Sequence, residues 1–265
     1  MNPSLDRRLR AAGVDAEARL DPGEAFARLH EREGQRATLL DRYALEAASR
    51  GVSVEDLPHA LRAELQADVL RLHIPGWEVI GGSDRSRTDP IEVVASDPAW
   101  PELYQQWRRR LVQELGERAT RIEHVGSTAV PGLAAKPIID IQVSVLDVDD
   151  EAAYVPAIER AGIAFRARDL EHRYFRPSGD RPRDVQVHVC GAGSKWERVH
   201  VLFRDFLRAD AAAREAYRLL KLDLAARYQD DRIAYNEAKT SFILNALERA
   251  EAWAVERGWR LGNDA

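Results

Sequence analysis

Cysteine is nearly absent from this sequence, since Cys190 is the only one among 265 residues. A single cysteine excludes an intrachain disulfide and a cysteine-rich zinc site. The sequence also lacks an apolar run long enough to span a bilayer, and its N-terminus has no apolar signal-peptide core. We therefore expect a cytoplasmic protein with no membrane partner.

Two further features narrow the function. The sequence has no GxxxxGK[ST] phosphate-binding loop, which argues against a kinase of the P-loop class. Its 39 Lys and Arg residues are outnumbered by 44 Asp and Glu, giving a formal charge of −5. An acidic balance argues against nucleic acid as the main partner and leaves small nucleotides open as ligands.

The chain divides into two parts by composition. Residues 1–82 predict a helical extension, because leucine and alanine recur there at helical spacing. Residues 83–90 are polar and turn-rich, so they predict a linker. Residues 91–265 predict one further domain. The N-terminal helices either pack on that domain or bind a protein partner, and the sequence leaves both open.

Strand and helix patterns in the second part predict a mixed sheet flanked by helices, which is an α+β fold. Strand segments show apolar runs or strict alternation, and helical segments show one apolar face. The expected strands are 91–95, 122–125, 138–145, 163–168, 173–176 and 184–190, and the expected helices are 98–117, 151–161 and two or three between 195 and 257.

A strand, a glycine turn and a second strand form the most informative segment, residues 121–145. Gly126, Ser127 and Thr128 offer a flexible backbone and two hydroxyls where the first strand ends. Such residues let backbone N–H groups approach an anion closely. The alternative is that the two hydroxyls only satisfy backbone groups of the turn.

Asp140 is the one carboxylate in the apolar second strand. Burying a carboxylate is costly unless something binds it, and a cation is the obvious candidate. Lys136, four residues earlier, either binds a phosphate or pairs with Asp140. The segment therefore suggests a site for a phosphate and a metal ion.

The run HVGSTAVPGLAAKPIIDI, residues 124–141, resembles the signature of the GrpB family. The resemblance continues through VQVHV at 185–189, the FRDFLR segment at 203–208 and the residues around Tyr235 and Lys239. It covers residues 91–250, approximately. The family has a nucleotidyltransferase fold and occurs alone or fused behind a dephospho-CoA kinase. The resemblance therefore implies a nucleotidyltransferase-like mixed sheet.

The resemblance also implies roles for the candidate residues. In the superfamily a Gly-Ser turn holds the triphosphate, which corresponds here to Gly126 and Ser127. Two aspartates at i and i+2 hold Mg²⁺ or Mn²⁺, and Asp140 matches the first. The second position carries Gln142, whose neutral oxygen is a weaker ligand. This departure puts metal-dependent catalysis in question.

The alternating segment 184–190 adds two candidates. Asp184 and His188 point to the same face of the expected strand, because alternate residues do so. His188 is a candidate catalytic base or ligand, with a structural hydrogen bond as the equal alternative. Asp184 is a candidate remote metal carboxylate.

The C-terminal helices carry basic residues that suit phosphate. Arg204, Tyr235 and Lys239 are favoured because they lie in segments that resemble the family. The alternative is that these side chains form a solvated helix face.

Three functions remain open. The first is a transferase that moves a nucleotidyl or phosphoryl group from an NTP to an acceptor. The second is a non-catalytic module that binds a nucleotide or a CoA precursor. The third is a folding or interaction partner that acts through the N-terminal helices.

Overall fold

The computed structural model describes residues 3–14, 21–80, 90–178 and 181–262. It consists of two compact units. The first unit combines Met1–Pro75 with Asp231–Leu244, and the second combines Gly76–Asp230 with Asn245–Ala265. The expected linker at 83–90 lies outside the described residues except for its last position. A short C-terminal segment thus folds with the N-terminal helices, a grouping that chain order does not reveal.

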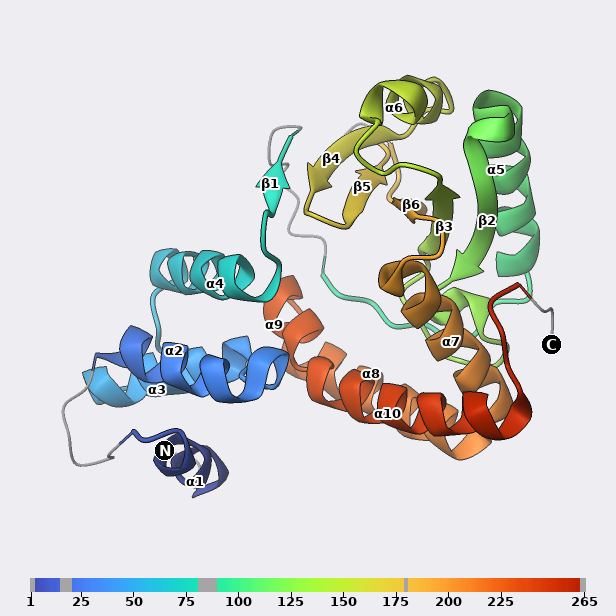
Figure 1. Ribbon diagram of the computed structural model, residues 1–265. Coiled ribbons are helices and arrows are strands. Elements are labelled where there is room, and N and C mark those ends of the chain that lie inside the picture. The colour runs from blue at the N-terminus through green and yellow to red at the C-terminus, as the bar shows by residue number, and fades with distance from the viewer. Residues whose placement is uncertain (1–2, 15–20, 81–89, 179–180, 263–265) are drawn as a thin grey trace. The chain divides into compact units, whose positions relative to one another are not determined.

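Helices build the first unit (Figure 1). Asp21 begins the second of them, because its carboxylate accepts the backbone N–H groups of Gly23 and Glu24. Gly34 ends that helix at φ +57°, which separates it from the next long helix. The helices are α1 (Pro3–Ala11), α2 (Pro22–Glu33), α3 (Leu39–Arg50), α4 (His59–His73) and α9 (Arg232–Glu237).

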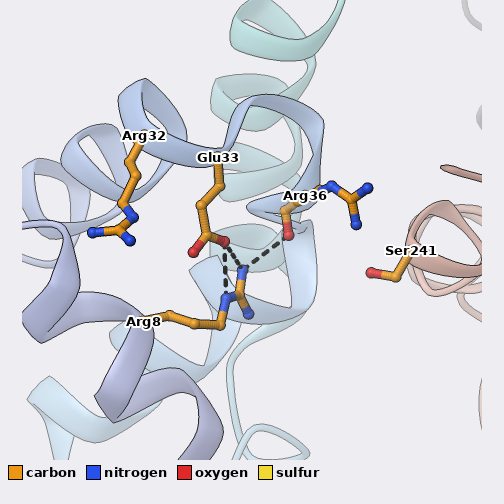
Figure 2. Close-up of a pocket in the computed structure, with 5 residues that line it drawn as sticks. All are labelled: Arg8, Arg32, Glu33, Arg36 and Ser241. Carbon is orange, nitrogen blue, oxygen red and sulfur yellow. Dashed lines mark hydrogen bonds and ion pairs between the residues drawn. The ribbon is translucent and has the colours of Figure 1, made fainter. Parts of the chain in front are cut away.

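Arg8 joins three of these helices. Its guanidinium donates to the carboxylate of Glu33 in α2 at 2.7 Å and to that of Asp41 in α3 at 3.0 Å. It also donates to the backbone carbonyl of Arg36 at 2.9 Å. Figure 2 shows the contacts of Arg8 with Glu33 and with the Arg36 carbonyl, at the wall of a pocket of about 610 Å³ lined by Arg8, Arg32, Glu33, Arg36 and Ser241. Because the two carboxylates are mostly buried, Arg8 is their main compensation.

We expect Arg8→Ala to release α1 from the first unit. Removing the cation takes away the charged partner of Glu33 and leaves Asp41 with only its hydrogen bonds from Thr38, which costs about 1–3 kcal/mol. Hydrogen exchange of the amides in α1 should accelerate by at least tenfold. Arg227→Ala is the matched control, because Arg227 pairs with Asp223 at an exposed i, i+4 site of the second unit and such pairs contribute little. Equal exchange in both variants would contradict this account of Arg8.

A six-stranded mixed sheet forms the centre of the second unit. Its strand order is β1-β4-β5-β6-β3-β2, and every neighbouring pair is antiparallel except β3 and β6. The strands are β1 (Glu78–Val79), β2 (Ala119–Val125), β3 (Ile139–Val145), β4 (Ala164–Arg168), β5 (His172–Arg176) and β6 (Val185–Gly191).

The two faces of this sheet differ in polarity. Isoleucine and valine side chains of β3 and β6 pack on one face against α5 (Trp100–Leu115) and α6 (Glu151–Arg160). The opposite face carries the polar alternates of the same strands, among them Asp140, Gln142 and His188. On that face α7 (Lys195–Ala209) lies against Gln142, whose amide donates to the carbonyl of Glu197. Figure 1 shows α5 and α6 beside the sheet. The chain also forms α8 (Ala211–Arg227) and α10 (Thr240–Arg257).

The structure confirms the expected fold class, a nucleotidyltransferase-like mixed sheet flanked by helices with N-terminal helices added. The edge strand expected at 91–95 is wrong. Only Val94 pairs there, exchanging two 2.9 Å hydrogen bonds with Ala135, because the N–H of Ile91 turns instead to the carbonyl of Gln229. The C-terminal part contains four helices rather than two or three.

Candidate functional site

The glycine turn after β2 holds Asp140 in place. Val125 pairs with Asp140 across the sheet, and Gly126 follows with φ +70°. A Cβ at Gly126 would lie 2.3 Å from a carboxylate oxygen of Asp140, so only glycine fits here. The Asp140 side chain keeps 29% of its surface exposed. The glycine turn is therefore packed against the Asp140 carboxylate, and part of that carboxylate is accessible to a ligand.

Lys221 of α8 is the buried cation of this site, and it was not among the candidates predicted from the sequence. Lys221 is only 2% exposed, and its ammonium donates to the hydroxyl of Ser127 at 2.9 Å and to the carbonyl of Ala134. Burial, together with the nearby charge of Lys136, lowers the pKa of Lys221 to about 7, although the charge of Asp140 acts in the opposite direction. Lys136, Asp140 and Ser127 thus all act on one buried ammonium. In the sequence, Lys221 is one lysine on a helix face that carries both polar and apolar residues. Such lysines are too common for the sequence to single this one out.

His188 lies beside Asp140, as the alternation of β6 predicts. The Nε2 atom of His188 is 3.8 Å from the Asp140 carboxylate. On its other side, Nδ1 lies 2.9 Å from Nε2 of His172. The rings of His172 and His200 stack on Trp196 at 4.7 and 3.7 Å. Burial lowers the pKa of His172 and that of His200 to about 4, so both are neutral at neutral pH.

Thr128 and Arg204 make contacts within the protein. The Thr128 hydroxyl bonds with Nε2 of His124 at 3.0 Å and with the carbonyl of Ile138 at 3.2 Å. Arg204 is 7% exposed, and its guanidinium donates to Asp205 and Glu123, both at 2.7 Å. Both side chains are therefore engaged in holding the strands and α7 around the site, and their contact with a ligand stays a prediction.

The remaining candidates are Tyr235, Lys239 and Asp184. Tyr235 and Lys239 belong to the first unit, where the Lys239 ammonium lies 4.3 Å from the Tyr235 ring centroid. Asp184 is exposed just before β6, and its carbonyl accepts the N–H of Ile139. Their roles stay predictions.

A two-metal centre does not fit the donor set. Gln142 is fully buried, its amide nitrogen donates to the Glu197 carbonyl at 3.3 Å, and its side-chain oxygen is unpaired. A carboxylate in that position would lie buried under α7 beside the acidic Glu197, which explains an amide there. Across the residues that the structure describes, no group of three His, Cys, Asp or Glu side chains could hold a metal ion.

The site contains two sets of groups that suit a phosphate ester. Ser127, Lys136 and Lys221 offer a hydroxyl and two ammonium groups, which suit phosphate oxygens. Asp140 and His188 offer a carboxylate and an imidazole, which suit a cation or a proton. These groups lie on adjacent strands, a turn and α8, so one ligand could contact both sets.

No helix within the described ranges is long and apolar enough to cross a membrane.

Comparison with known proteins gives a consistent match. The sequence model of the family described as GrpB protein matches residues 90–249. A UPF0157 protein of Streptomyces coelicolor is 42% identical over 177 residues, which is 66% of this chain and 90% of that protein. A crystal structure described as conserved protein GrpB from Enterococcus faecalis has a TM-score of 0.55 at 32% identity, covering 61% of this chain and 99% of that one.

Proteins named dephospho-CoA kinase also match. The one from Mycobacterium bovis is 34% identical over 197 residues, which is 64% of this chain and 48% of that protein. This chain therefore corresponds to about half the length of that relative.

Proposed function

Because the chain belongs to the GrpB family, we propose that it binds a nucleoside triphosphate beside Asp140 and transfers a nucleotidyl or phosphoryl group to an acceptor hydroxyl. The observation that carries the proposal is the buried ammonium of Lys221, bonded to Ser127 on a turn whose glycine packs against Asp140. A buried cation with a lowered pKa is typical of a site that takes up an anion.

Each residue has a defined part in this proposal. Ser127, Lys136 and Lys221 bind the phosphate oxygens, and their charge stabilises the negative charge that develops during transfer. His188 accepts the proton of the attacking hydroxyl at its Nε2 atom, which faces Asp140. Gly126 keeps the backbone close enough for the Asp140 carboxylate to remain beside the phosphate end.

The donor set favours one cation carried in with the triphosphate. Mg²⁺ is commonly held by one or two carboxylates together with substrate phosphates, and Asp140 supplies one. Bound in this way, Mg²⁺ or Mn²⁺ would neutralise phosphate charge. Gln142 does not add a second carboxylate, so Asp140 is the residue that would hold the ion.

A second candidate function is binding without catalysis. It is favoured by Gln142, and a CoA precursor is a candidate ligand because several relatives are named dephospho-CoA kinase. In that case the site would recognise phosphate by the same three residues but need no metal ion. A protein partner for the N-terminal helices and a cytoplasmic location are compatible with both candidates.

Thermal unfolding in the presence of ligands tests the proposal without assuming a reaction. A ligand that binds only the folded state raises the melting temperature, by about 2.7 kcal/mol of stabilisation at a hundredfold excess over Kd. NTPs, CoA precursors and sugar phosphates are to be compared with and without Mg²⁺ or Mn²⁺. A metal-dependent shift with an NTP supports transfer, and a metal-independent shift supports the binding module.

Asp140→Asn should remove the metal-dependent part of that shift while the protein stays folded. The amide keeps the shape of the carboxylate but not its charge, so an ion is held more weakly. Asp184→Asn is the comparison, and an equal loss there would make Asp184 a second ligand. If Asp140→Asn lowers the melting temperature of the ligand-free protein but leaves the ligand-induced shift unchanged, the carboxylate is structural and the proposed site is wrong.

A further inference from the structure

Four side chains form a continuous line into the candidate site. The Asp169 carboxylate lies 3.1 Å from Nδ1 of His172, and Nε2 of His172 lies 2.9 Å from Nδ1 of His188. Nε2 of His188 then lies 3.8 Å from the carboxylate of Asp140. Asp169 lies in the turn between β4 and β5 and His172 begins β5, whereas His188 and Asp140 lie on the paired strands β6 and β3. The line therefore begins outside the residues that bind the ligand.

The direction of the hydrogen bonds in this line follows from Asp169. A carboxylate accepts only, and the pKa of Asp169 is lowered, because hydrogen bonds from His172 and the N–H of Glu171 outweigh the effect of burial. His172 must therefore carry its proton on Nδ1. Being neutral, it presents an unprotonated Nε2, which can only accept. The proton between the two rings must consequently belong to Nδ1 of His188.

We propose that His172 and Asp169 are positioning residues that hold His188 in the Nδ1–H tautomer, so that its Nε2 lone pair faces Asp140. This inference deepens the proposed function, since a proton acceptor needs that lone pair. When a hydroxyl attacks a phosphorus atom of the triphosphate, its oxygen forms the new P–O bond while the bridging P–O bond breaks and the rest of the nucleotide or diphosphate leaves with that oxygen. The hydroxyl gives its proton to Nε2, while Nδ1–H remains bonded to His172. The line thus fixes which nitrogen reacts, as carboxylate–histidine pairs do in other sites.

His200 provides a comparison within the same cluster. Like His172, it stacks on Trp196 and is buried, but its Nδ1 bonds to the carbonyl of Trp196 at 2.8 Å. Replacing either histidine with phenylalanine keeps an aromatic ring beside Trp196. Only the replacement of His172 removes the acceptor for His188.

Nitrogen NMR of the intact protein labelled with ¹⁵N-histidine tests the proposal. At alkaline pH, where an imidazole is neutral, we expect the His188 signal of the wild type to show a protonated Nδ1 and an unprotonated Nε2. The signal is assigned by its loss in His188→Gln. In His172→Phe the signal should move toward the Nε2–H tautomer that free histidine favours, and in His200→Phe it should not change. Binding of inorganic tripolyphosphate should remain within twofold of wild type in His172→Phe.

Several results would overturn the proposal. A wild-type His188 protonated on Nε2 would do so without any variant, even if no ligand or activity is found. An unchanged tautomer in His172→Phe, or an equal change in His200→Phe, would show that His172 does not set it. If His172→Phe does not fold, a through-hydrogen-bond ¹⁵N–¹⁵N coupling between His172 and His188 in the wild type decides, and its absence counts against the line. Loss of tripolyphosphate binding would make His172 part of ligand binding instead.

Discussion

Gly126→Ala is expected to lower the melting temperature and to abolish ligand binding at the candidate site. An L-residue at φ +70° is strained by about 1–2 kcal/mol. The new Cβ would also lie 2.3 Å from the Asp140 carboxylate, and such overpacking costs about 1–3 kcal/mol more. For a chain of this size the sum corresponds to a fall of roughly 10 °C. Calorimetry and ligand titration measure the two effects.

Gly132→Ala separates backbone strain from the clash with Asp140. Gly132 has φ +76°, nearly the same as Gly126, but a Cβ there meets no atom within 4 Å. The control should therefore lose only the strain energy and should keep ligand binding. If both variants lose stability and binding equally, the contact between Gly126 and Asp140 does not organise the site.

Local sequence patterns predict the part of the site that lies on the sheet. Strict alternation puts His188 on the polar face of β6, and a glycine at the end of β2 predicts the turn beside Asp140. The parallel pairing of β3 with β6 then places His188 next to Asp140. The alternation and the turn need only a period of two and one glycine, so they can be read from the sequence, whereas the parallel pairing and its register are known only from the structure.

Contacts made by helices could not be read in the same way. Lys221 becomes important only because α8 brings its ammonium to Ser127, ninety-four positions away along the chain. Tyr235 lies in α9, whereas Lys239 lies in the turn after that helix, so the two do not share a helical face, and the segment that contains them folds with the N-terminal helices. The sequence did not indicate His172, because its proposed role depends on a contact between its Nε2 and Nδ1 of His188 that only the folded sheet creates. Tertiary packing, not local propensity, decides all three.

Lys221 should also make the stability of the protein depend on pH. Its pKa is lowered to about 7 in the folded state, whereas an unfolded lysine has a pKa near 10.5. Between these values the unfolded state binds more protons, so the free energy of unfolding rises with pH. Each pKa unit corresponds to about 1.36 kcal/mol, which sets a ceiling of roughly 5 kcal/mol for the whole window. Below pH 7 both states are protonated, and the full cost of burying the charge is present.

Lys221→Met removes this titration, so the difference in unfolding free energy between variant and wild type should fall as the pH rises from 7 to 10. The variant gains most at pH 6 to 7, where it avoids the buried charge, and it loses the hydrogen bonds to Ser127 and Ala134 at every pH. Urea unfolding at four or five pH values measures the difference, in which all other titrating groups cancel. The exposed Lys195→Met should give a difference that does not change with pH. If the difference for Lys221→Met also does not change with pH, the lysine remains charged in the folded protein. An anionic ligand would then meet a permanent positive charge beside Ser127. Otherwise, binding of the anion must first cause Lys221 to take up a proton.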